Sequence, residues 1–385
     1  MTTGRQTDIL HSEYVAPEGF GAFPPAIHYA STVLFPNVAA MRSTEWKEKN
    51  AYTYGLHGTP TTFTLEARLA EIEGGTHCLL APSGLAAISM VILGMLRSGD
   101  DLLIPDNAYN PCRDLGKWLQ RDYGITTRFY DPMVGSGIAD LIQPNTRLVW
   151  TESPGSVTME VPDLRAICAA ARARGIPVAI DNTWSAGLGL RAFDLGVDIV
   201  VQALTKYQSG GSDVLMGAAI TREAALNERI AHAHMRLGLG VSPGDAYLVM
   251  RGLPSMKLRF DAHDTGARAV ATWLKGRAEV ASVLHPAFED CPGHEFFKRD
   301  FTGAGGLFSV VFDPKYTEEQ VDRFVDALKL FKIGYSWGGA HSLVMPYRVA
   351  AIRSNWGRGT LVRFNVGLED PRDLVADIEQ ALASL

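Results

Sequence analysis

The feature that most constrains the fold of this chain is an alternation of short β-branched runs with Ala- and Leu-containing stretches between Leu79 and Ile220. The runs have the length of strands, and the stretches between them carry apolar residues at helical spacing. This alternation predicts an α/β protein whose mostly parallel sheet is covered by helices on both faces. The expected strands are Leu79–Ala81, Asp101–Ile104, Ile125–Tyr130, Arg147–Thr151, Val178–Asp181 and Ile199–Gln202.

The rest of the chain does not follow this alternation. At roughly 150 residues per domain, 385 residues suggest two or three units. We predict an N-terminal arm over residues 1–50, a large ligand-binding domain over 51–250 and a smaller α+β domain over 251–385. The expected helices include Val161–Arg174, Asp245–Arg251 and Met256–Lys275, the first with Pro162 at its start and Gly175 after its end.

Composition excludes several classes of protein. A hydrophobic fraction of 46% with a net charge of -6 is typical of a globular chain and excludes intrinsic disorder. The acidic balance argues against a nucleic acid or an anionic membrane as partner. No apolar run is long enough to span a bilayer, and the first residues lack a signal-peptide pattern. Four separated cysteines predict reduced thiols, no metal site and a cytoplasmic location.

Two charged residues follow neighbouring predicted strands. Asp181 closes the run Val178–Asp181, and Lys206 comes shortly after Ile199–Gln202. Open α/β sheets bind ligands at the carboxyl ends of their strands. Either residue alone is more often a surface charge. Together they place a carboxylate and an amine where both can reach one ligand.

A third element suits the same ligand. The segment Ala81–Leu85 reads as a strand, a turn and the start of a helix, so the backbone N–H groups of Gly84 and Leu85 are available to a phosphate. On its own, such a step is usually an ordinary helix cap. A phosphate cradle, an amine and a strand-end carboxylate together indicate pyridoxal 5'-phosphate, which needs an anchor, a Schiff-base lysine and a partner for its ring nitrogen.

The chain also carries motifs that resemble the transsulfuration-type pyridoxal phosphate enzymes, the fold-type I group of cystathionine lyases and synthases and methionine γ-lyase. Three further stretches resemble bacterial cystathionine β-lyases: Glu152–Glu160, Lys298–Gly303 and Tyr335–Gly339. The family motifs are Tyr54-Gly55, Gly58-Thr59, Ser83-Gly84, Glu152-Ser153-Pro154, Asp181-Asn182-Thr183 and Thr205-Lys206-Tyr207. The resemblance implies a fold-type I PLP-dependent transferase-like fold, with the cofactor in the 51–250 domain.

The resemblance also implies roles for individual residues. Lys206 would bind the cofactor covalently and move the Cα proton, and Asp181 would keep the ring nitrogen protonated. Tyr109 would stack on the ring, although alone it reads as a loop aromatic. Arg363 would pair with the substrate carboxylate, a role that suits its planar fork. Ser83, Gly84, Leu85 and Thr205 would bind the phosphate, with Tyr54 reaching it from a neighbouring subunit, while Ser336, Trp337 and Tyr335 would line the substrate pocket.

The activity implied is β-elimination of L-cystathionine to homocysteine, pyruvate and ammonia, as part of methionine biosynthesis. The Tyr335–Trp337 stretch favours β chemistry through resemblance, whereas local physics does not decide between β and γ chemistry. Cystathionine γ-lyase, methionine γ-lyase and cysteine desulfhydrase are alternatives on the same scaffold, as is an inactive homologue that binds the cofactor. The family predicts a homotetramer that acts on a small sulfur amino acid and shares active sites between subunits.

Two positions depart from the family pattern. Leu56 replaces an arginine that many members use to bind the phosphate, and Ala203 replaces a serine. Loss of one charge-assisted hydrogen bond costs about 1.5–3 kcal/mol. We expect weaker cofactor binding unless His57 or another cation compensates. Leu56→Arg should then tighten cofactor binding, measured as a dissociation constant, and an unchanged constant would contradict the hypothesis.

Overall fold

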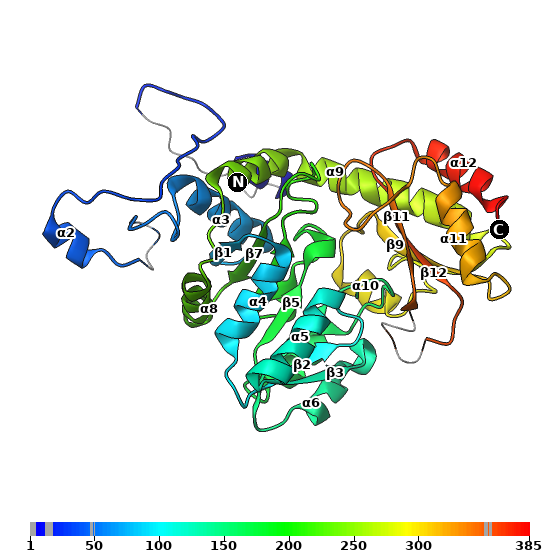
Figure 1. The fold of residues 1–385 in the computed structure, drawn as a ribbon, viewed down its shortest axis with the longest axis horizontal. Helices are drawn as coiled ribbons and strands as arrows, with labels where there is room; N and C mark the ends of the chain where they lie inside the picture. The colour runs from blue at the N-terminus through cyan, green and yellow to red at the C-terminus, as the bar shows by residue number, and fades with distance from the viewer. Residues whose placement is uncertain (1–4, 12–17, 47–48, 50, 350–352, 354–355) are drawn as a thin grey trace.

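The computed structural model describes residues 5–11, 18–46, 49, 51–349, 353 and 356–385. Within these residues the chain forms a seven-stranded sheet and a five-stranded sheet, joined by one long helix (Figure 1).

The seven-stranded sheet confirms the predicted α/β architecture. Its order is β1-β7-β6-β5-β4-β2-β3, and β7 runs antiparallel to both of its neighbours while the other paired strands are parallel. The strands are β1 (His77–Ala81), β2 (Asp101–Pro105), β3 (Thr126–Tyr130), β4 (Thr146–Glu152), β5 (Val178–Asp181), β6 (Ile199–Ala203) and β7 (Gly217–Thr221).

Helices cover both faces of this sheet because its central strands are apolar on both sides. Leu102 and Ile104 of β2 pack in one core with α4, α5 and α8, whereas Leu103 faces a second core that includes α3, α7 and α9. The elements of this part are α3 (Pro60–Glu73), α4 (Gly84–Met95), α5 (Asn110–Tyr123), η1 (Pro132–Gly137), α6 (Ile138–Leu141), α7 (Leu164–Arg172), η2 (Thr183–Ser185), η3 (Ala192–Leu195), α8 (Ala224–Leu237) and α9 (Pro243–Lys275).

Helix α7 is shorter than the predicted Val161–Arg174. It begins after Asp163, whose side chain accepts a hydrogen bond from the Ala166 N–H and so caps the first turn. Val161 instead donates its N–H to the Pro292 carbonyl. The start expected at Pro162 was therefore wrong, because the Asp163 cap, one residue later, sets where the helix begins.

Helix α9 replaces the two helices predicted on either side of Pro254. It runs without a break over 33 residues with Pro254 inside it. A proline inside a helix costs about 3 kcal/mol. Met250, Leu253 and Met256 are all buried on the same core, so continuous packing offsets that cost. Because α9 crosses residue 250, the domain boundary placed there stays a prediction.

The five-stranded sheet has the order β10-β11-β12-β9-β8. Its core contains apolar residues of α9, α11 and α12, for example Val270, Phe324 and Ile378. Figure 1 shows α11 and α12 at the end of the molecule far from α8. The elements are β8 (Val280–Leu284), α10 (His294–Asp300), β9 (Leu307–Phe312), α11 (Glu318–Ala327), β10 (Lys332–Ile333), β11 (Leu343–Tyr347), β12 (Leu361–Asn365) and α12 (Pro371–Leu382).

The N-terminal segment contains α1 (Arg5–Leu10) and α2 (Val38–Ser43). Figure 1 shows α2 and the chain beside it projecting away from the two sheets. Residues 1–4, 12–17, 47–48 and 50 of the predicted arm lie outside the described residues. None of the described helices is long and apolar enough to cross a membrane. The four cysteines are buried and free.

Candidate active site

The candidate site lies where β4, β5 and β6 end. Glu152 closes β4 and Asp181 closes β5, and the two residues are paired in register. Lys206 follows β6 after a short turn in which its N–H donates to the Ala203 carbonyl. Three ionisable side chains thus meet at the carboxyl edge of the sheet, the position expected for a ligand site in an open α/β fold.

Lys206 makes contact with the predicted substrate pocket. Its Nζ donates a hydrogen bond to Ser336 Oγ at 2.7 Å and lies 5.2 Å from the centre of the Trp337 ring. Burial lowers the pKa of Lys206 to about 8, with Arg363 contributing in the same direction and Asp181 opposing it. An amine with this pKa can hold or release a proton near neutral pH.

Ser336 reaches Lys206 through an unusual backbone conformation. Its φ is 88°, a region that non-glycine residues seldom adopt. Gly338 also has a positive φ and approaches the backbone of Lys206 and Tyr207, where a side chain would have little room. The turn after β10 therefore brings Ser336 and Trp337 onto the lysine.

Asp181 is held by the first residues after its strand. Its Oδ1 accepts hydrogen bonds from the Thr183 N–H at 3.1 Å and from the Thr183 hydroxyl at 2.5 Å. Burial raises the pKa of Asp181, whereas these hydrogen bonds and the Lys206 charge oppose the rise. A half-buried carboxylate with one oxygen fixed in this way is suited to receive a proton donor at its other oxygen.

Tyr109 stands at the start of α5 and is tied to Glu152. The Tyr109 N–H donates to Glu152 Oε2 at 2.7 Å, and the Ser156 hydroxyl donates to Glu152 Oε1 at 2.5 Å. Tyr109 is 43% exposed, so its side chain is accessible to a ligand. Burial and the neighbouring Asp181 raise the pKa of Glu152 to about 8.

The start of α4 forms a close-fitting cradle. Ser83 caps the helix by accepting from the Ala86 N–H at 3.0 Å. A Cβ on Gly84 would come 2.7 Å from the Ala203 Cβ, and one on Gly217 would come 2.4 Å from the Ser83 carbonyl oxygen. Glycine is therefore required on both sides of the helix start, next to β6 and β7. Gly84 and Leu85 lie in the first turn, where N–H groups lack intrahelical partners and attract anions.

Thr205 lies beside this cradle and also braces its own loop, because its hydroxyl accepts a hydrogen bond from the Met216 N–H at 3.2 Å. Ala203, which departs from the family pattern, packs against the first turn of α4.

Arg363 comes from the five-stranded sheet, where it pairs in register with Met345 and Ser309. Its guanidinium lies 5.2 Å from the centre of the Tyr347 ring. Burial lowers the pKa of Arg363, while the hydroxyls of Tyr347, Tyr335 and Tyr109 oppose that change. Within the described part of the chain no carboxylate is paired with Arg363, so a substrate carboxylate is the partner that this charge fits.

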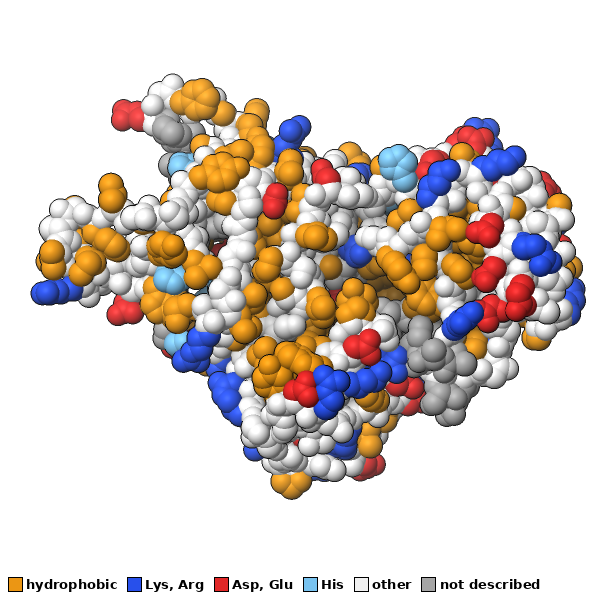
Figure 2. Space-filling view, viewed as in Figure 1, with side chains coloured by type: hydrophobic (Ala, Val, Ile, Leu, Met, Phe, Trp, Pro, Cys, Tyr) orange, Lys and Arg blue, Asp and Glu red, His pale blue; other side chains and the backbone are white. Residues whose placement is uncertain are grey.

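The structure brings together all the predicted site residues except Tyr54. Tyr54 instead forms a bridge with Thr32 and contacts His57, and its side chain is 48% exposed. The role predicted for Tyr54 in a neighbouring subunit stays a prediction. Tyr335 is 77% exposed at the edge of the site. Figure 2 shows the face of the molecule hollowed between the two sheets, with hydrophobic side chains along the walls.

Two residues of the site were missed as site residues by the sequence reasoning. Glu152 ends a strand in the same way as Asp181, so the signal that identified Asp181 could have found it. Tyr347 ends β11 and has no motif of its own, and only the pairing of β11 with β12 brings it to Arg363.

The residues present fit pyridoxal phosphate. The cradle of α4 suits a phosphate, and the half-buried Asp181 suits a ring nitrogen. Lys206 supplies the amine at the same strand edge, and Tyr109 offers a ring face. Each element is fixed by contacts within the chain, so the site is preorganised for such a group.

Comparison with known proteins agrees with this arrangement. The chain is 40% identical over 375 residues to the cystathionine beta-lyase of Escherichia coli K12, covering 95% of this chain and 94% of the relative. It is 37% identical to the L-alanine/L-glutamate racemase of Wolbachia pipientis wMel, covering 95% and 93%. A solved cystathionine gamma synthase from Xanthomonas oryzae pv. oryzae, in complex with aminoacrylate and cysteine, superposes with a TM-score of 0.91 at 30% identity, covering 100% and 99%.

The family model described as Cys/Met metabolism PLP-dependent enzyme matches residues 6–383, almost the whole chain. This match agrees with the strand-end site, the helix cradle and the lysine described above. The chain belongs to the Cys/Met metabolism family of PLP-dependent enzymes.

Proposed function

We propose that this protein is a carbon-sulfur β-lyase that converts L-cystathionine and water to homocysteine, pyruvate and ammonia. The observation that carries the proposal is the Lys206 amine, which is hydrogen-bonded to Ser336 and whose pKa is influenced by the charges of Arg363 and Asp181. The cystathionine beta-lyase of Escherichia coli, a relative of nearly the same length, supports the choice of substrate.

The phosphate would be held by the first turn of α4, with Ser83, Gly84 and Leu85, together with Thr205. Lys206 would form the covalent link, Asp181 would pair with the ring nitrogen, and Tyr109 would cover one face of the ring. Pyridoxal phosphate, when bound, supplies an electron sink for the pair left behind when the substrate Cα loses its proton.

The protein's own residues then bind the substrate and move protons. Arg363 would hold the α-carboxylate through two parallel hydrogen bonds, which fixes the Cα–H bond relative to Lys206. Lys206 would take the Cα proton, as its lowered pKa permits, and return a proton to the sulfur when the Cβ–S bond breaks. Ser336 would keep the amine in place between these two transfers.

The test is to incubate the protein, saturated with pyridoxal phosphate, with L-cystathionine and to identify the products. Pyruvate and homocysteine in equal amounts are expected. Oxobutyrate with cysteine would instead assign γ-elimination, and loss of optical activity from an amino acid without carbon-sulfur cleavage would assign racemisation. Lys206→Ala is the control, since any product that persists in this variant does not come from the proposed site.

We also propose a homotetramer in the cytoplasm with active sites shared between subunits. The N-terminal segment supports the assembly, because it exposes large apolar side chains that include Phe23 at 94% and Leu34 at 89%. Four buried free cysteines are typical of a reducing compartment. Sedimentation of the native protein tests the assembly, and localisation of the tagged chain in cells tests the compartment.

A further inference from the structure

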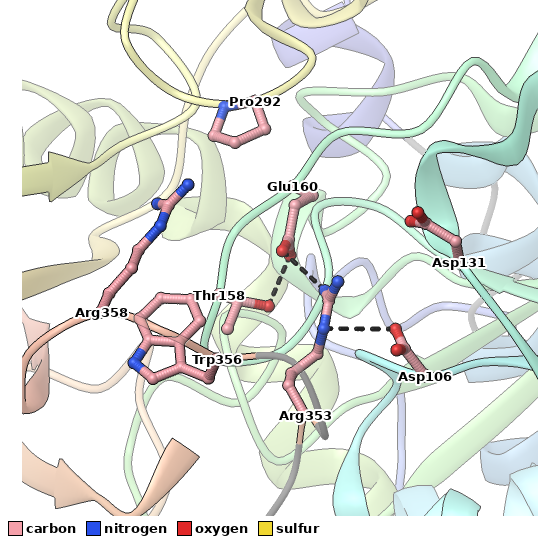
Figure 3. Close-up of a pocket in the computed structure, with 8 residues that line it drawn as sticks. All are labelled: Asp106, Asp131, Thr158, Glu160, Pro292, Arg353, Trp356 and Arg358. Atoms are coloured by element: carbon pink, nitrogen blue, oxygen red, sulfur yellow. Dashed lines mark hydrogen bonds and ion pairs between the residues drawn. The ribbon is translucent and has the colours of Figure 1, made fainter. Parts of the chain in front are cut away.

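A second charged cluster lies beside the candidate site and takes no part in the proposed chemistry. It borders a cavity of about 230 Å³ between the end of β2 and the segment that joins β11 to β12 (Figure 3). The cavity is lined by Asp106, Asp131, Thr158, Glu160, Pro292, Arg353, Trp356 and Arg358.

Arg353 joins two carboxylates across this cluster. Its Nη1 donates to Glu160 Oε1 at 2.6 Å, and its Nε lies 3.4 Å from Asp106 Oδ1, as the dashed lines in Figure 3 show. Arg353 comes from the segment between β11 and β12, whereas both carboxylates come from loops of the seven-stranded sheet. We call Arg353, Asp106 and Glu160 the Arg353 clasp.

The clasp stabilises the partly buried carboxylate of Asp106. The buried Oδ1 of Asp106 makes no hydrogen bond within the described residues, so nearby positive charge is what stabilises it. Burial raises the pKa of Asp106, and Arg353 opposes the rise more strongly than the more distant Arg113. Loss of the Arg353 guanidinium would leave two adjacent carboxylates without their shared partner.

The clasp is connected to the loop that carries Tyr109 through the hydrogen bond between Glu160 and Asn107. Glu160 Oε2 accepts from Asn107 Nδ2 at 2.9 Å and from the Thr158 hydroxyl at 2.5 Å. Asn107 is fully buried and lies so close to Gly155 that a Cβ there would clash with the Asn107 amide. Asn107 therefore has little freedom, and Tyr109 follows it by two residues.

The clasp is also connected to the surroundings of Arg363, through the backbone that follows β11. The Arg353 N–H donates to the Val349 carbonyl at 2.7 Å, and Val349 follows Tyr347, the last residue of β11, by two residues. The Tyr347 ring lies against the Arg363 guanidinium. The clasp thus connects the loop that carries Tyr109 with the strand end that supports Arg363.

We infer that Arg353 is a positioning residue that fixes the separation of Tyr109 from Arg363 and so sets how tightly the site holds an amino acid carboxylate. The inference rests on the proposed roles of Tyr109 and Arg363. None of the residues assigned to substrate or cofactor binding belongs to the clasp, so its effect should fall on amino acid binding more than on the chemical step. A residue far from the reacting atoms can matter in this way, because a misplacement of about 1 Å in the site can greatly reduce activity.

The experiment compares Arg353→Met and Arg353→Lys with Arg358→Met in the cofactor-loaded protein. Arg358 lines the same cavity, but its guanidinium lies over the Trp356 ring, 5.3 Å from the ring centre, and takes no part in the clasp. The readouts are the dissociation constant of a non-reacting amino acid, followed through cofactor absorbance, the KM and kcat for cystathionine, the cofactor dissociation constant and the melting temperature.

Arg353→Met should raise the amino acid dissociation constant and the KM roughly tenfold, with a smaller change in kcat. Cofactor affinity should stay close to that of Arg358→Met, whereas the melting temperature should be lower, because Asp106 and Glu160 lose their shared cationic partner. Arg353→Lys keeps the charge and should recover part of the binding. The inference is overturned if Arg353→Met binds the amino acid as Arg358→Met does, or if cofactor affinity falls in proportion to amino acid binding.

Arg363→Met in the same assay separates this inference from the proposed function. It should bind the amino acid far more weakly than the native protein. If it binds normally, the role proposed for Arg363 is wrong and the inference falls with it. If Arg363→Met loses binding while Arg353→Met keeps it, the proposed function stands and the clasp is only structural.

Discussion

Lys206 is a charged group held in an environment that disfavours its charge. Its pKa is about 8 in the folded chain against 10.5 for an exposed lysine, with burial as the main cause. At pH 7 the amine is protonated in both the folded and unfolded states, so the folded state carries the full cost of the buried charge. Between pH 8 and 10.5 the folded state loses the proton first, and stability from this group rises with pH.

Lys206→Met should therefore stabilise the cofactor-free protein. We expect a gain of about 2 kcal/mol at pH 7, after allowing for the lost hydrogen bond to Ser336. The gain should shrink as the pH rises towards 10. Urea unfolding of both cofactor-free proteins at pH 7 and pH 10 checks this, and a Met variant that is less stable at pH 7 would contradict it.

Glu152 has the opposite dependence on pH. Its pKa is raised from 4.5 to about 8 by burial and by Asp181. From pH 4.5 to 8 the folded state keeps a proton that the unfolded state has lost, so the stability contributed by this group falls as the pH rises. Glu152→Gln keeps an oxygen that can accept from the Tyr109 N–H and removes the titration.

The Gln variant should match the native protein in stability near pH 5 and exceed it at pH 9. Glu152→Ala provides the matched comparison, because it also removes the acceptor for the Tyr109 N–H. It should weaken cofactor binding and alter the visible circular dichroism of the cofactor. If the free energy of unfolding depends on pH in the same way in Glu152→Gln and in the native protein, Glu152 does not titrate as stated.

Asp181 and Lys206 could be predicted from the sequence because an apolar run predicts each strand. Asp181 is the last residue of one strand, and Lys206 comes shortly after the next. Sequence reasoning left Glu152 as part of a motif without a role, because burial of that carboxylate appears only once β4 is paired with β5. It placed Arg363 on a strand, but the tyrosines around the guanidinium depend on how three segments of the chain meet.

At the scale of single elements, helix starts matter most for the site. The start of α4 must pass close to β6, and Gly84 leaves no space for a side chain against Ala203. Gly84→Ala should push the first turn away from the strand ends and weaken cofactor binding by about tenfold, as expected for the loss of a hydrogen bond to a charged group. The cofactor dissociation constant measures this.

Ala203→Gly added to Gly84→Ala should restore much of the lost affinity, since it removes the Cβ that Gly84→Ala would meet. If the double variant binds no better than Gly84→Ala, the contact with Ala203 is not what positions the start of α4.

Element boundaries were also where local patterns failed. Asp163 starts α7 later than Pro162 suggested, because a side-chain cap outweighed the proline signal. Pro254 suggested a break that α9 does not have, because buried residues on both sides keep the helix on one core. The first error arises from a competing local signal, and the second arises where packing against residues distant in sequence overrides a local preference.

At the scale of the whole molecule, the proposed assembly predicts that a neighbouring subunit completes the site. Tyr54 forms a bridge with Thr32 and is exposed, as are apolar side chains of the N-terminal segment such as Phe23 and Leu34. A neighbouring subunit that covers this surface would bring its own Tyr54 to the phosphate, as the family resemblance implies. Two variants that are inactive alone, Tyr54→Ala and Lys206→Ala, can test this by co-expression.

If active sites are shared, a mixed dimer of the two variants contains one site with both substitutions and one site with neither. Random pairing makes half of the dimers mixed, so the co-expressed protein should regain about a quarter of native activity. Mixing the two purified variants without subunit exchange should give none. If each site is built from a single chain, every site carries one substitution, and co-expression restores no activity either.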